Sequence, residues 1–369
     1  MMLAIFKNYL NQTQTMTQFK QRIEQGLSGE YTGLANGFER INKYIYNIQR
    51  GCFSLIGGLS GSSKTTLCDF IVLNGIQDAK AKGIPINVTY YSWEIDEFTK
   101  KANWLSVLIY NKYNRIISPQ TIKGLGDSRL TPEELEIVNS ELPELEDLFS
   151  KITWFWTPVN PTGLYHHWWT TMSKKGTFVT EPYIDENNEP KEKIISWKAN
   201  NLNEYNLVVI DHALLAKLER GFTPKQNIDK MSEYIVACRN MFNMTFFMVQ
   251  QFNQSLSNID RVKFRGVSLE PEMGDFRDSV NPYIDADIVM GLLNPAKMQL
   301  ETSLGYNINV DGFPYNLKYK YRLLKIIKNR LGQDNISIGL YTKPEAGYFE
   351  ELPKAVDMTS EDYTRYLNK

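Results

Sequence analysis

Short apolar runs alternate with segments of helical periodicity along most of the chain. The runs at 52–58, 86–94 and 205–215 are rich in β-branched, aromatic and aliphatic residues and contain or adjoin glycine or acidic residues. This pattern predicts buried strands. Further strands are expected at 245–253, 286–295, 319–330 and 336–342. Strands that alternate with helices predict a largely parallel, twisted α/β sheet flanked by helices.

The segments between the strands have helical signals. Residues 65–83 predict a helix that ends near a glycine, and 95–113 has helical spacing. Thr131 is expected to cap a helix, because a proline and then a glutamate three residues on follow it. The segment 227–243 places its apolar residues on one helical face. These residues are Ile228, Met231, Ile235 and Phe242.

The pattern breaks between 153 and 205. This stretch is rich in tryptophan and then becomes acidic and polar, which predicts a hairpin-like excursion between two core elements. We therefore expect an N-terminal extension at 1–32 with a short helix, and one main domain at 33–355 with an insertion at about 157–204. A C-terminal tail is expected at 356–369.

Composition narrows the class of protein. With 369 residues, 42% hydrophobic and 22% charged, the chain can bury a sizeable core. No apolar run reaches about 18 residues, so we expect no membrane span. Three cysteines without a C-x-x-C pair favour a reducing compartment, and a cytoplasmic location is expected. The net charge of -1 does not by itself indicate a nucleic-acid partner.

The stretch "GLSGSSKTT" at 58–66 carries the first candidate chemistry. It nearly matches the phosphate-binding motif G-x-x-x-x-G-K-[ST], and it lies between a predicted strand and a predicted helix. In that context, backbone N–H groups and the helix N-terminus bind phosphate anions. The predicted nucleotide contacts are Gly58, Ser60, Gly61, Ser62, Ser63, Lys64, Thr65 and Thr66. The alternative is a Gly/Ser turn with a solvated lysine.

Ser63 stands where the motif has its second glycine. Glycine permits a positive φ and a close approach to phosphates. We expect Ser63 to have a negative φ and a side chain that points away, with Gly61 supplying the flexibility. On that basis Ser63→Gly should leave ATP hydrolysis within a few-fold.

Three polar residues follow later predicted strands. Asp211 ends the run "LVVI" and can hold Mg²⁺ together with the Thr65 hydroxyl. Glu94 ends the next strand after the motif's helix and can polarise an attacking water. Gln251 ends the strand in "FFMVQQFN" and can sense the γ-phosphate. Each signal is weak alone, but carboxyl ends of parallel strands meet at the edge where such folds bind ligands.

Taken together, these motifs resemble the RecA-like motor domain of DnaB-type replicative helicases. The resemblance covers about residues 28–350. It rests on "SWEID", "NLVVIDHALL", "QQFNQSL", "GDFRDSVNPYIDADIVMGL" and "IIKNRLGQDNISIGLYTKPEAGYFEEL". It implies ATP and Mg²⁺ as ligands, with Lys64 and Thr65 as nucleotide and metal contacts. Glu94 would be the catalytic base, Asp211 a metal-binding acid and Gln251 the γ-phosphate sensor.

The resemblance also implies an assembly. Lys328 and Arg330 match a basic pair that reaches the ATP of the neighbouring subunit, with Arg330 as the arginine finger. The family forms hexameric rings that translocate 5′ to 3′ on single-stranded DNA, with primase or loader proteins as partners. An insertion longer than the family norm and the absence of the family's helical N-terminal domain are departures. The short helix at 16–26 would then grip the next protomer, so deletion of 1–27 should abolish ring formation.

The predicted DNA contacts lie between 253 and 281. Arg261, Lys263 and Arg265 form a basic cluster around Phe264. Arg277 and Asp278 match the family's phosphate-contacting pair. The alternative is a solvated loop, because nearby acids offset the bases.

Several other features favour structural roles. Lysine and arginine alternate with tyrosine in 317–330, which is typical of an edge strand or of a nucleic-acid surface. The strand is the preferred interpretation. The tryptophan cluster at 154–169 favours core packing over base stacking, and His166 and His167 are not expected to bind a metal.

Two other functions stay open. One is a RecA-like ATPase that does not unwind DNA, such as a recombinase-like filament or a loader or regulatory ATPase. The other is an assembly protein that does not hydrolyse ATP, for which Ser63 is the support. The Asn/Tyr/Ile-rich composition suggests a phage or another mobile element.

Overall fold

The computed structural model describes residues 32–266, 269–276, 280–312 and 314–369, with positions 16, 19–20, 23–24 and 26–27 before them. The strands used below are β1 (Phe53–Gly58), β2 (Ile86–Ser92), β3 (Ile152–Phe155), β4 (Gly176–Ile184), β5 (Pro190–Ala199), β6 (Tyr205–Asp211), β7 (Thr245–Gln251), β8 (Ile288–Leu293), β11 (Tyr321–Asn329), β12 (Ile336–Lys343) and β13 (Tyr348–Glu351). The helices are α2 (Asn42–Ile45), α3 (Lys64–Lys82), α4 (Glu97–Tyr113), α5 (Pro119–Ile122), α6 (Pro132–Ser150), α7 (Pro161–Ser173), α8 (Pro224–Phe242), α9 (Ile259–Arg265), α10 (Asn281–Asp285) and α11 (Ser360–Asn368). Two-residue strands β9 (Thr302–Ser303) and β10 (Tyr306–Asn307) form a small separate sheet.

The central sheet has nine strands in the order β13-β12-β11-β8-β1-β7-β6-β2-β3. β8, β1, β7, β6, β2 and β3 run parallel. β11, β12 and β13 complete the sheet as antiparallel neighbours. The predicted α/β sheet with a closing antiparallel hairpin is confirmed.

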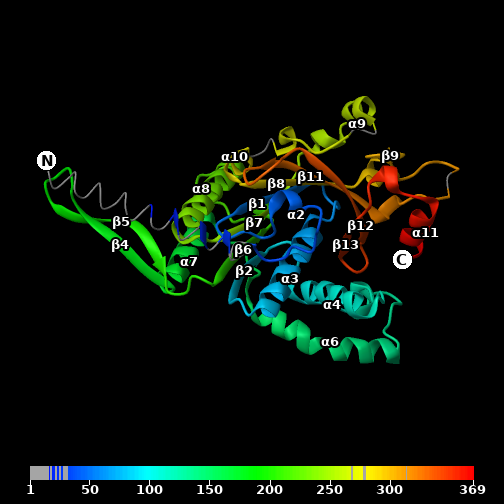
Figure 1. The fold of residues 1–369 in the computed structure, drawn as a ribbon, viewed down its shortest axis with the longest axis horizontal. Helices are drawn as coiled ribbons and strands as arrows, with labels where there is room; N and C mark the ends of the chain where they lie inside the picture. The colour runs from blue at the N-terminus through cyan, green and yellow to red at the C-terminus, as the bar shows by residue number, and fades with distance from the viewer. Residues whose placement is uncertain are drawn as a thin grey trace.

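Two apolar cores cover the two faces of this sheet. Successive strand residues point to opposite faces, so β1 sends Ile56 to one side and Phe53 and Leu55 to the other. The first core packs α3, α4 and α6 against the sheet. The second packs α7 and α8 against it, and Tyr363 and Tyr366 of α11 are buried there as well. Figure 1 shows these helix layers on either side of the strands.

Two of the predicted helix ends are confirmed by their capping contacts. α3 ends at Gly83, whose φ of 65° lets its N–H reach the carbonyl groups of Ala79 and Lys80. At the start of α6, Thr131 accepts from the N–H of Glu134, and the Glu134 carboxylate accepts from the N–H of Thr131.

Residues 153–205 are only partly the expected excursion. The hairpin is present, because β4 and β5 pair antiparallel from Gly176 to Ala199. It projects from the body on the side opposite the C-terminus (Figure 1). The tryptophan-rich part belongs to the core instead: β3 joins the sheet, and α7 buries Trp168 against it. The helix was missed because aromatic clustering hides its periodicity.

The strand predicted within 317–330 is confirmed, but its expected place at the edge of the sheet is wrong. β11 lies inside the sheet, between β8 and β12. Lys318–Lys320 form a 3₁₀ turn before the strand, and Arg322 is buried. The alternating basic and aromatic residues therefore straddle a turn and an inner strand.

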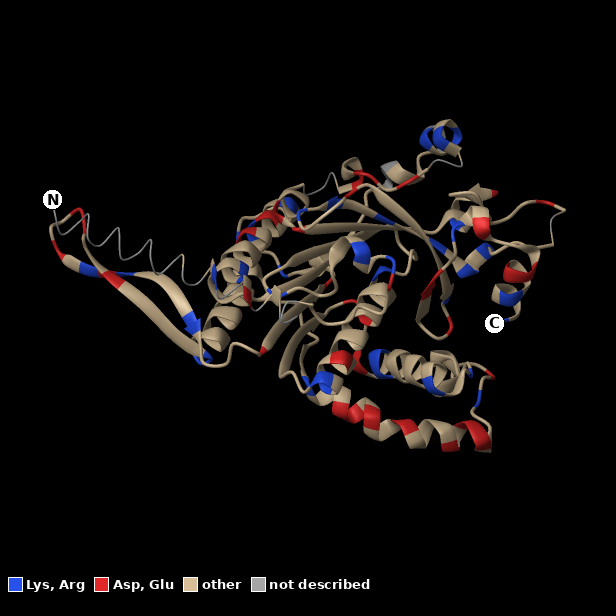
Figure 2. Cartoon of the chain, in the orientation of Figure 1, with Lys and Arg blue, Asp and Glu red and all other residues tan. Residues whose placement is uncertain are grey.

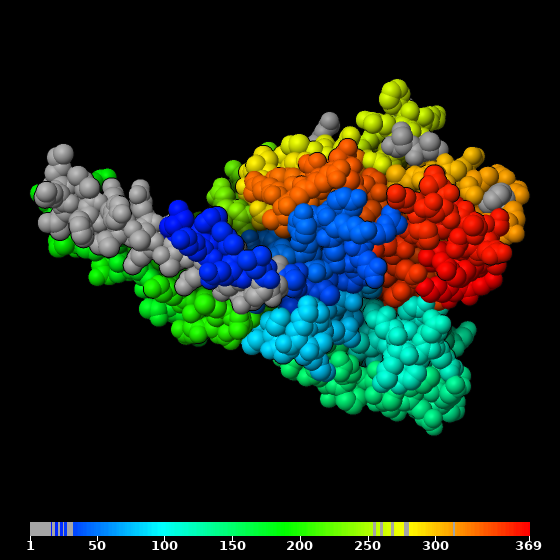
Figure 3. Space-filling view, in the orientation of Figure 1, coloured from blue at the N-terminus to red at the C-terminus, as the bar shows by residue number. Residues whose placement is uncertain are grey.

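The two ends of the described core lie side by side. The carboxylate of Glu351 accepts hydrogen bonds from the N–H groups of Glu39, Arg40 and Ile41. Figure 3 shows the blue and red segments in contact at this place. The described positions between 16 and 27 are helical. None of the helices that the structure describes is long and apolar enough to cross a membrane.

Candidate nucleotide-binding site

The loop between β1 and α3 is built around close backbone contacts. A Cβ on Gly58 would lie 2.4 Å from Ser62 Oγ and 2.7 Å from the Leu292 carbonyl oxygen, so only glycine fits. The loop closes through a hydrogen bond of 3.1 Å from the Ser62 N–H to the Leu59 carbonyl. α3 begins at Lys64, so its first N–H groups face the loop and can bind an anion.

The expectation for Ser63 is wrong. Its φ is 74° and its ψ is 32°, which is left-handed backbone, and Gly61 also has a positive φ of 69°. The chain thus enters α3 through a left-handed residue where the motif usually has glycine. Nor is the Ser63 hydroxyl without contact, because it accepts a hydrogen bond of 3.2 Å from Arg322 Nη2.

Lys64 and Thr65 point toward the ends of neighbouring strands. Lys64 is buried, and its Nζ donates to the Leu59 carbonyl at 3.0 Å. Burial lowers the pKa of Lys64, and the negative charges of Glu94 and Asp211 oppose that shift. Thr65 Oγ1 donates to Asp211 Oδ1 at 3.0 Å. The threonine and the aspartate that the sequence proposed for Mg²⁺ are therefore in direct contact.

Asp211 is fully buried at the end of β6. Its Oδ2 has no hydrogen-bond partner in the part of the chain that the structure describes. Burial raises the pKa of Asp211 to about 6, and the nearby Lys100 opposes this rise. A hydroxyl beside a carboxylate with an unused oxygen is a donor set that suits Mg²⁺. These residues fit the metal.

Glu94 and Gln251 complete the same edge of the sheet. Glu94 follows β2 and lies 3.8 Å from Nε2 of His212, which burial keeps at a lowered pKa. The Glu94 side chain is 52% exposed, so water can reach it. Gln251 ends β7 directly opposite Gly58 of β1. Because β1, β7, β6 and β2 are consecutive neighbours in the sheet, the structure brings all four strand ends together.

A buried lysine beneath the site was not expected from the sequence. Lys100 of α4 is fully buried, with its Nζ 2.9 Å from Asp69 Oδ2 and 3.9 Å from Asp211 Oδ2. The Tyr90 hydroxyl donates to Asp69 Oδ1 at 2.7 Å. The available signal was position: Lys100 lies one turn before Trp104, on the buried stripe of α4.

A cavity of about 440 Å³ opens beside the loop. Its lining includes Leu59 and Ser62 of the loop, Asn294 after β8, and the lysines Lys263 and Lys297. Ser62 Oγ and Asn294 Oδ1 are buried and without a hydrogen-bond partner among the described residues. Lys297 comes so close that a Cβ on Gly61 would lie 2.0 Å from its Nζ. Asn294 and Lys297 were missed, because they belong to no motif.

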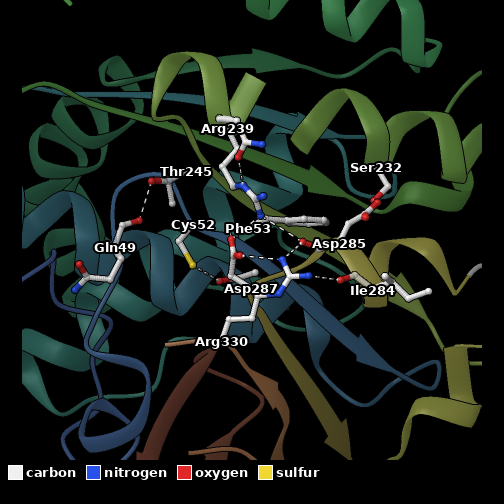
Figure 4. A network of polar contacts seen from close by, with 12 residues as sticks. Gln49, Cys52, Phe53, Ser232, Arg239, Thr245, Ile284, Asp285, Asp287 and Arg330 are labelled. Carbon is white, nitrogen blue, oxygen red and sulfur yellow. Dashed lines mark hydrogen bonds and ion pairs between the residues drawn. The ribbon is translucent and has the colours of Figure 1, made fainter. Parts of the chain in front are cut away.

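Lys328 and Arg330 lie at the opposite edge of the sheet. β11 is antiparallel to β8, so Lys328 and the end of β11 lie beside the start of β8. Lys328 Nζ donates to the carbonyl groups of Tyr283 and Ile284 at 2.8 and 2.5 Å. Arg330 donates to Asp287 Oδ1 at 3.3 Å, and Figure 4 shows it there with Arg239. The structure does not bring this pair to the loop of its own chain.

The proposed DNA contacts are divided by the fold. Arg261 of α9 is tied to acids, with Nη1 2.5 Å from Asp275 Oδ1 and Nη2 3.1 Å from Glu272 Oε1. Lys263 and Arg265 are exposed, and Phe264 is 88% exposed. Figure 2 shows these cations on a helix that stands away from the body. Arg277 and Asp278 lie outside the described residues.

The fold has known counterparts. A solved structure described as an ATPase domain aligns with a TM-score of 0.65 at 16% identity, over 92% of this chain and 98% of that one. This protein has the fold of a RecA-like ATPase domain. A DnaB-like replicative helicase, described with its interactions with primase, aligns with a TM-score of 0.63 at 16% identity, over 87% of this chain. This chain spans 64% of that protein's length.

At this identity the likeness establishes the fold, and the predicted resemblance to a DnaB-like helicase domain is confirmed at the level of the fold. No protein-family model and no curated protein matches the sequence.

Proposed function

We propose that this protein is an ATP-driven DNA helicase that moves along single-stranded DNA as an oligomeric ring. The observation that carries the proposal is the convergence of Lys64, Thr65, Glu94, Asp211 and Gln251 at one edge of a RecA-like sheet. In particular, the Thr65–Asp211 contact joins the loop to the strand two places away across the sheet.

Each residue has a role that its surroundings support. The loop N–H groups and Lys64 bind the β- and γ-phosphates of ATP, and Thr65 and Asp211 hold Mg²⁺, which neutralises phosphate charge. Glu94 is exposed to water and accepts its proton as the water attacks the γ-phosphate. Gln251 ends the strand beside β1, where a change at the γ-phosphate can pass into the segment that leads to α9.

The proposal includes neighbours and DNA. The Arg330 side chain is 46% exposed and lies away from the nucleotide-binding loop of its own chain. This position suits an arginine finger that reaches the nucleotide of the neighbouring subunit. Exposed apolar side chains at positions 16, 19, 23 and 27 repeat at helical spacing, as a helix packed on another protomer would require. Lys263 and Arg265 are exposed cations for DNA phosphates. Movement in the 5′ to 3′ direction, a hexamer, and a primase or loader partner belong to the proposal through family resemblance.

An ATPase that does not unwind DNA is the second candidate. It is favoured by the ion pairs of Arg261 with Asp275 and Glu272 and of Arg265 with Glu272, which engage two of the three cations on α9.

The test compares ATP turnover with and without single-stranded DNA, and unwinding of a forked duplex. Wild type should hydrolyse ATP faster with DNA, and Lys64→Ala should abolish turnover. Lys82→Ala is the matched control, because Lys82 lies at the far end of the same helix and pairs with Asp78 at the surface. Turnover indifferent to DNA and without unwinding supports the second candidate. No turnover at all points to an assembly protein.

A further inference from the structure

Arg322 holds the nucleotide-binding loop from the side of β11. Its Nε donates to the Ser62 carbonyl at 3.2 Å, and its Nη2 donates to Ser63 Oγ at 3.2 Å. Its Nη1 donates to the carbonyl groups of Tyr319 and Tyr321 at 2.8 and 2.7 Å. The guanidinium therefore joins the start of an inner strand to the two residues before α3.

The charge of Arg322 is buried among neutral acceptors. Arg322 is 4% exposed, and no carboxylate forms an ion pair with it in the described part of the chain. Burial lowers the pKa of Arg322 to about 10, so it stays protonated at neutral pH. A buried charge without a counter-ion is costly unless something nearby compensates it. The adjacent feature is a loop built to bind an anion.

The backbone conformation of Ser63 explains why the loop needs support from Arg322. Its φ of 74° is a conformation that glycine adopts freely and that other residues adopt at a cost. The neighbouring left-handed position, Gly61, has no such cost. Without support, Ser63 would tend to relax to a negative φ. That rotation would redirect the N–H groups at the start of α3, which must all face the phosphates.

We propose that Arg322 is a positioning residue that holds Ser62 and Ser63 in the phosphate-binding conformation, with the Ser63 hydroxyl as its point of attachment. The pair takes the place of the freedom that a glycine would provide at position 63. This inference rests on the proposed function, since it assumes that the loop binds a nucleotide.

The test is a set of binding measurements with MgATP on the full-length protein. Arg322→Met keeps the apolar stem and removes the donors, and it should weaken binding by about tenfold or more, as expected for a strained left-handed residue without support. Ser63→Gly serves as the comparison background, because glycine adopts the left-handed conformation at this position without cost. In the Ser63→Gly background, Arg322→Met should cost at least about threefold less than in wild type, because glycine needs no holder.

A role in folding alone would not give this coupling, because a glycine in the loop cannot restore a lost core. Urea unfolding of the nucleotide-free variants distinguishes a loss of stability from a specific loss of nucleotide binding. If Arg322→Met does not fold, Ser63→Ala replaces it: alanine keeps the strain and loses the hydroxyl, so it should bind about tenfold more weakly than Ser63→Gly.

The outcomes are distinct. Equal costs of Arg322→Met in both backgrounds, or Ser63→Ala equal to Ser63→Gly, overturn the inference and leave the proposed function standing. Wild-type protein that binds no MgATP overturns both.

Discussion

At the carboxyl edge of the parallel strands, Asp211 is fully buried and its Oδ2 has no hydrogen-bond partner among the described residues. At the opposite edge, Asp287 is also mostly buried but is fully engaged. It accepts from Arg239 at 2.8 Å, from Arg330 at 3.3 Å and from the Phe53 N–H at 2.9 Å (Figure 4). The same sheet therefore contains Asp211, which has an oxygen without a hydrogen-bond partner, and Asp287, which accepts three hydrogen bonds.

This difference distinguishes a candidate ligand-binding edge from an edge whose contacts stabilise the fold. Buried polar groups in folded proteins are almost always hydrogen-bonded, so an exception needs an explanation. At the carboxyl edge the explanation that we propose is ligand binding, because the Thr65–Asp211 contact lies beside the loop between β1 and α3. The contacts of Asp287 at the opposite edge hold strand ends together. Arg330 tests this distinction between the two edges. It lies at the edge that contains Asp287, but we propose that it acts in catalysis.

Arg330→Ala should have the largest effect. An arginine finger is worth about 10³–10⁵ in rate, so turnover of the assembled protein should fall by that order. Stability should change by less than about 1 kcal/mol, because the Arg330 side chain is 46% exposed and Asp287 keeps its contacts with Arg239 and the Phe53 N–H. Steady-state ATP turnover and urea unfolding measure the two effects.

Arg239→Ala is the control, because Arg239 binds the same aspartate but is only 12% exposed. We expect it to lose stability rather than turnover. Mixing Arg330→Ala with Lys64→Ala subunits should restore part of the activity, since each supplies what the other lacks. If Arg330→Ala turns over ATP as fast as wild type, the proposed role as an arginine finger is wrong and Arg330 has only a structural role.

Lys100→Met should have the next largest effect, on stability. Lys100 is the buried cation between Asp69 and Asp211, and its removal leaves Asp69 without its ion pair. Breaking a buried ion pair costs about 3–5 kcal/mol, which urea unfolding can measure. The double variant Asp69→Leu/Lys100→Met should recover much of this loss, because an apolar pair needs no counter-charge. A double variant as unstable as the single one would show that Lys100 stabilises the fold through contacts other than Asp69.

The sequence was informative wherever residues act through local pattern. The strand-ending residues Glu94, Asp211 and Gln251 could be placed at one edge, because parallel strands bring their carboxyl ends together. The capping box at Thr131 is equally local. These predictions needed no knowledge of which strands are neighbours.

Features that depend on long-range packing could not be predicted. Lys100 and Arg322 act on residues 31 and 259 or more positions away, and only the fold joins them. The φ of Ser63 was predicted with the wrong sign, because sequence favours negative φ for serine and cannot register a buried arginine from β11 that supports the other conformation. The helix α7 was missed for a different reason, because its clustered aromatic residues hide the helical periodicity.

Asp211→Asn should change stability by less than Lys100→Met does, and the sign of the change distinguishes the two edges. The folded-state pKa of Asp211 is about 6, above the ordinary value of 3.8. A raised pKa means that folding favours the protonated form, so the charged carboxylate destabilises the nucleotide-free protein at neutral pH. Asparagine carries no charge, and we expect the free energy of unfolding of the variant to exceed that of wild type by about 1–3 kcal/mol at pH 7.5.

The pH dependence makes this prediction specific. The penalty on wild type is fully present above pH 6 and fades as the pH falls from about 6 toward 3.8, because Asp211 becomes protonated in the folded state first. The advantage of Asp211→Asn in urea unfolding should therefore shrink over the same range. Asp287→Asn should do the reverse at pH 7.5 and destabilise the protein, because it weakens the contacts with Arg239 and Arg330. If both substitutions destabilise by similar amounts at neutral pH, the carboxylate of Asp211 is already compensated without a ligand. The charge at the carboxyl edge would then be as well compensated as the charge at the opposite edge. The unpartnered Oδ2 of Asp211 would no longer indicate a metal site.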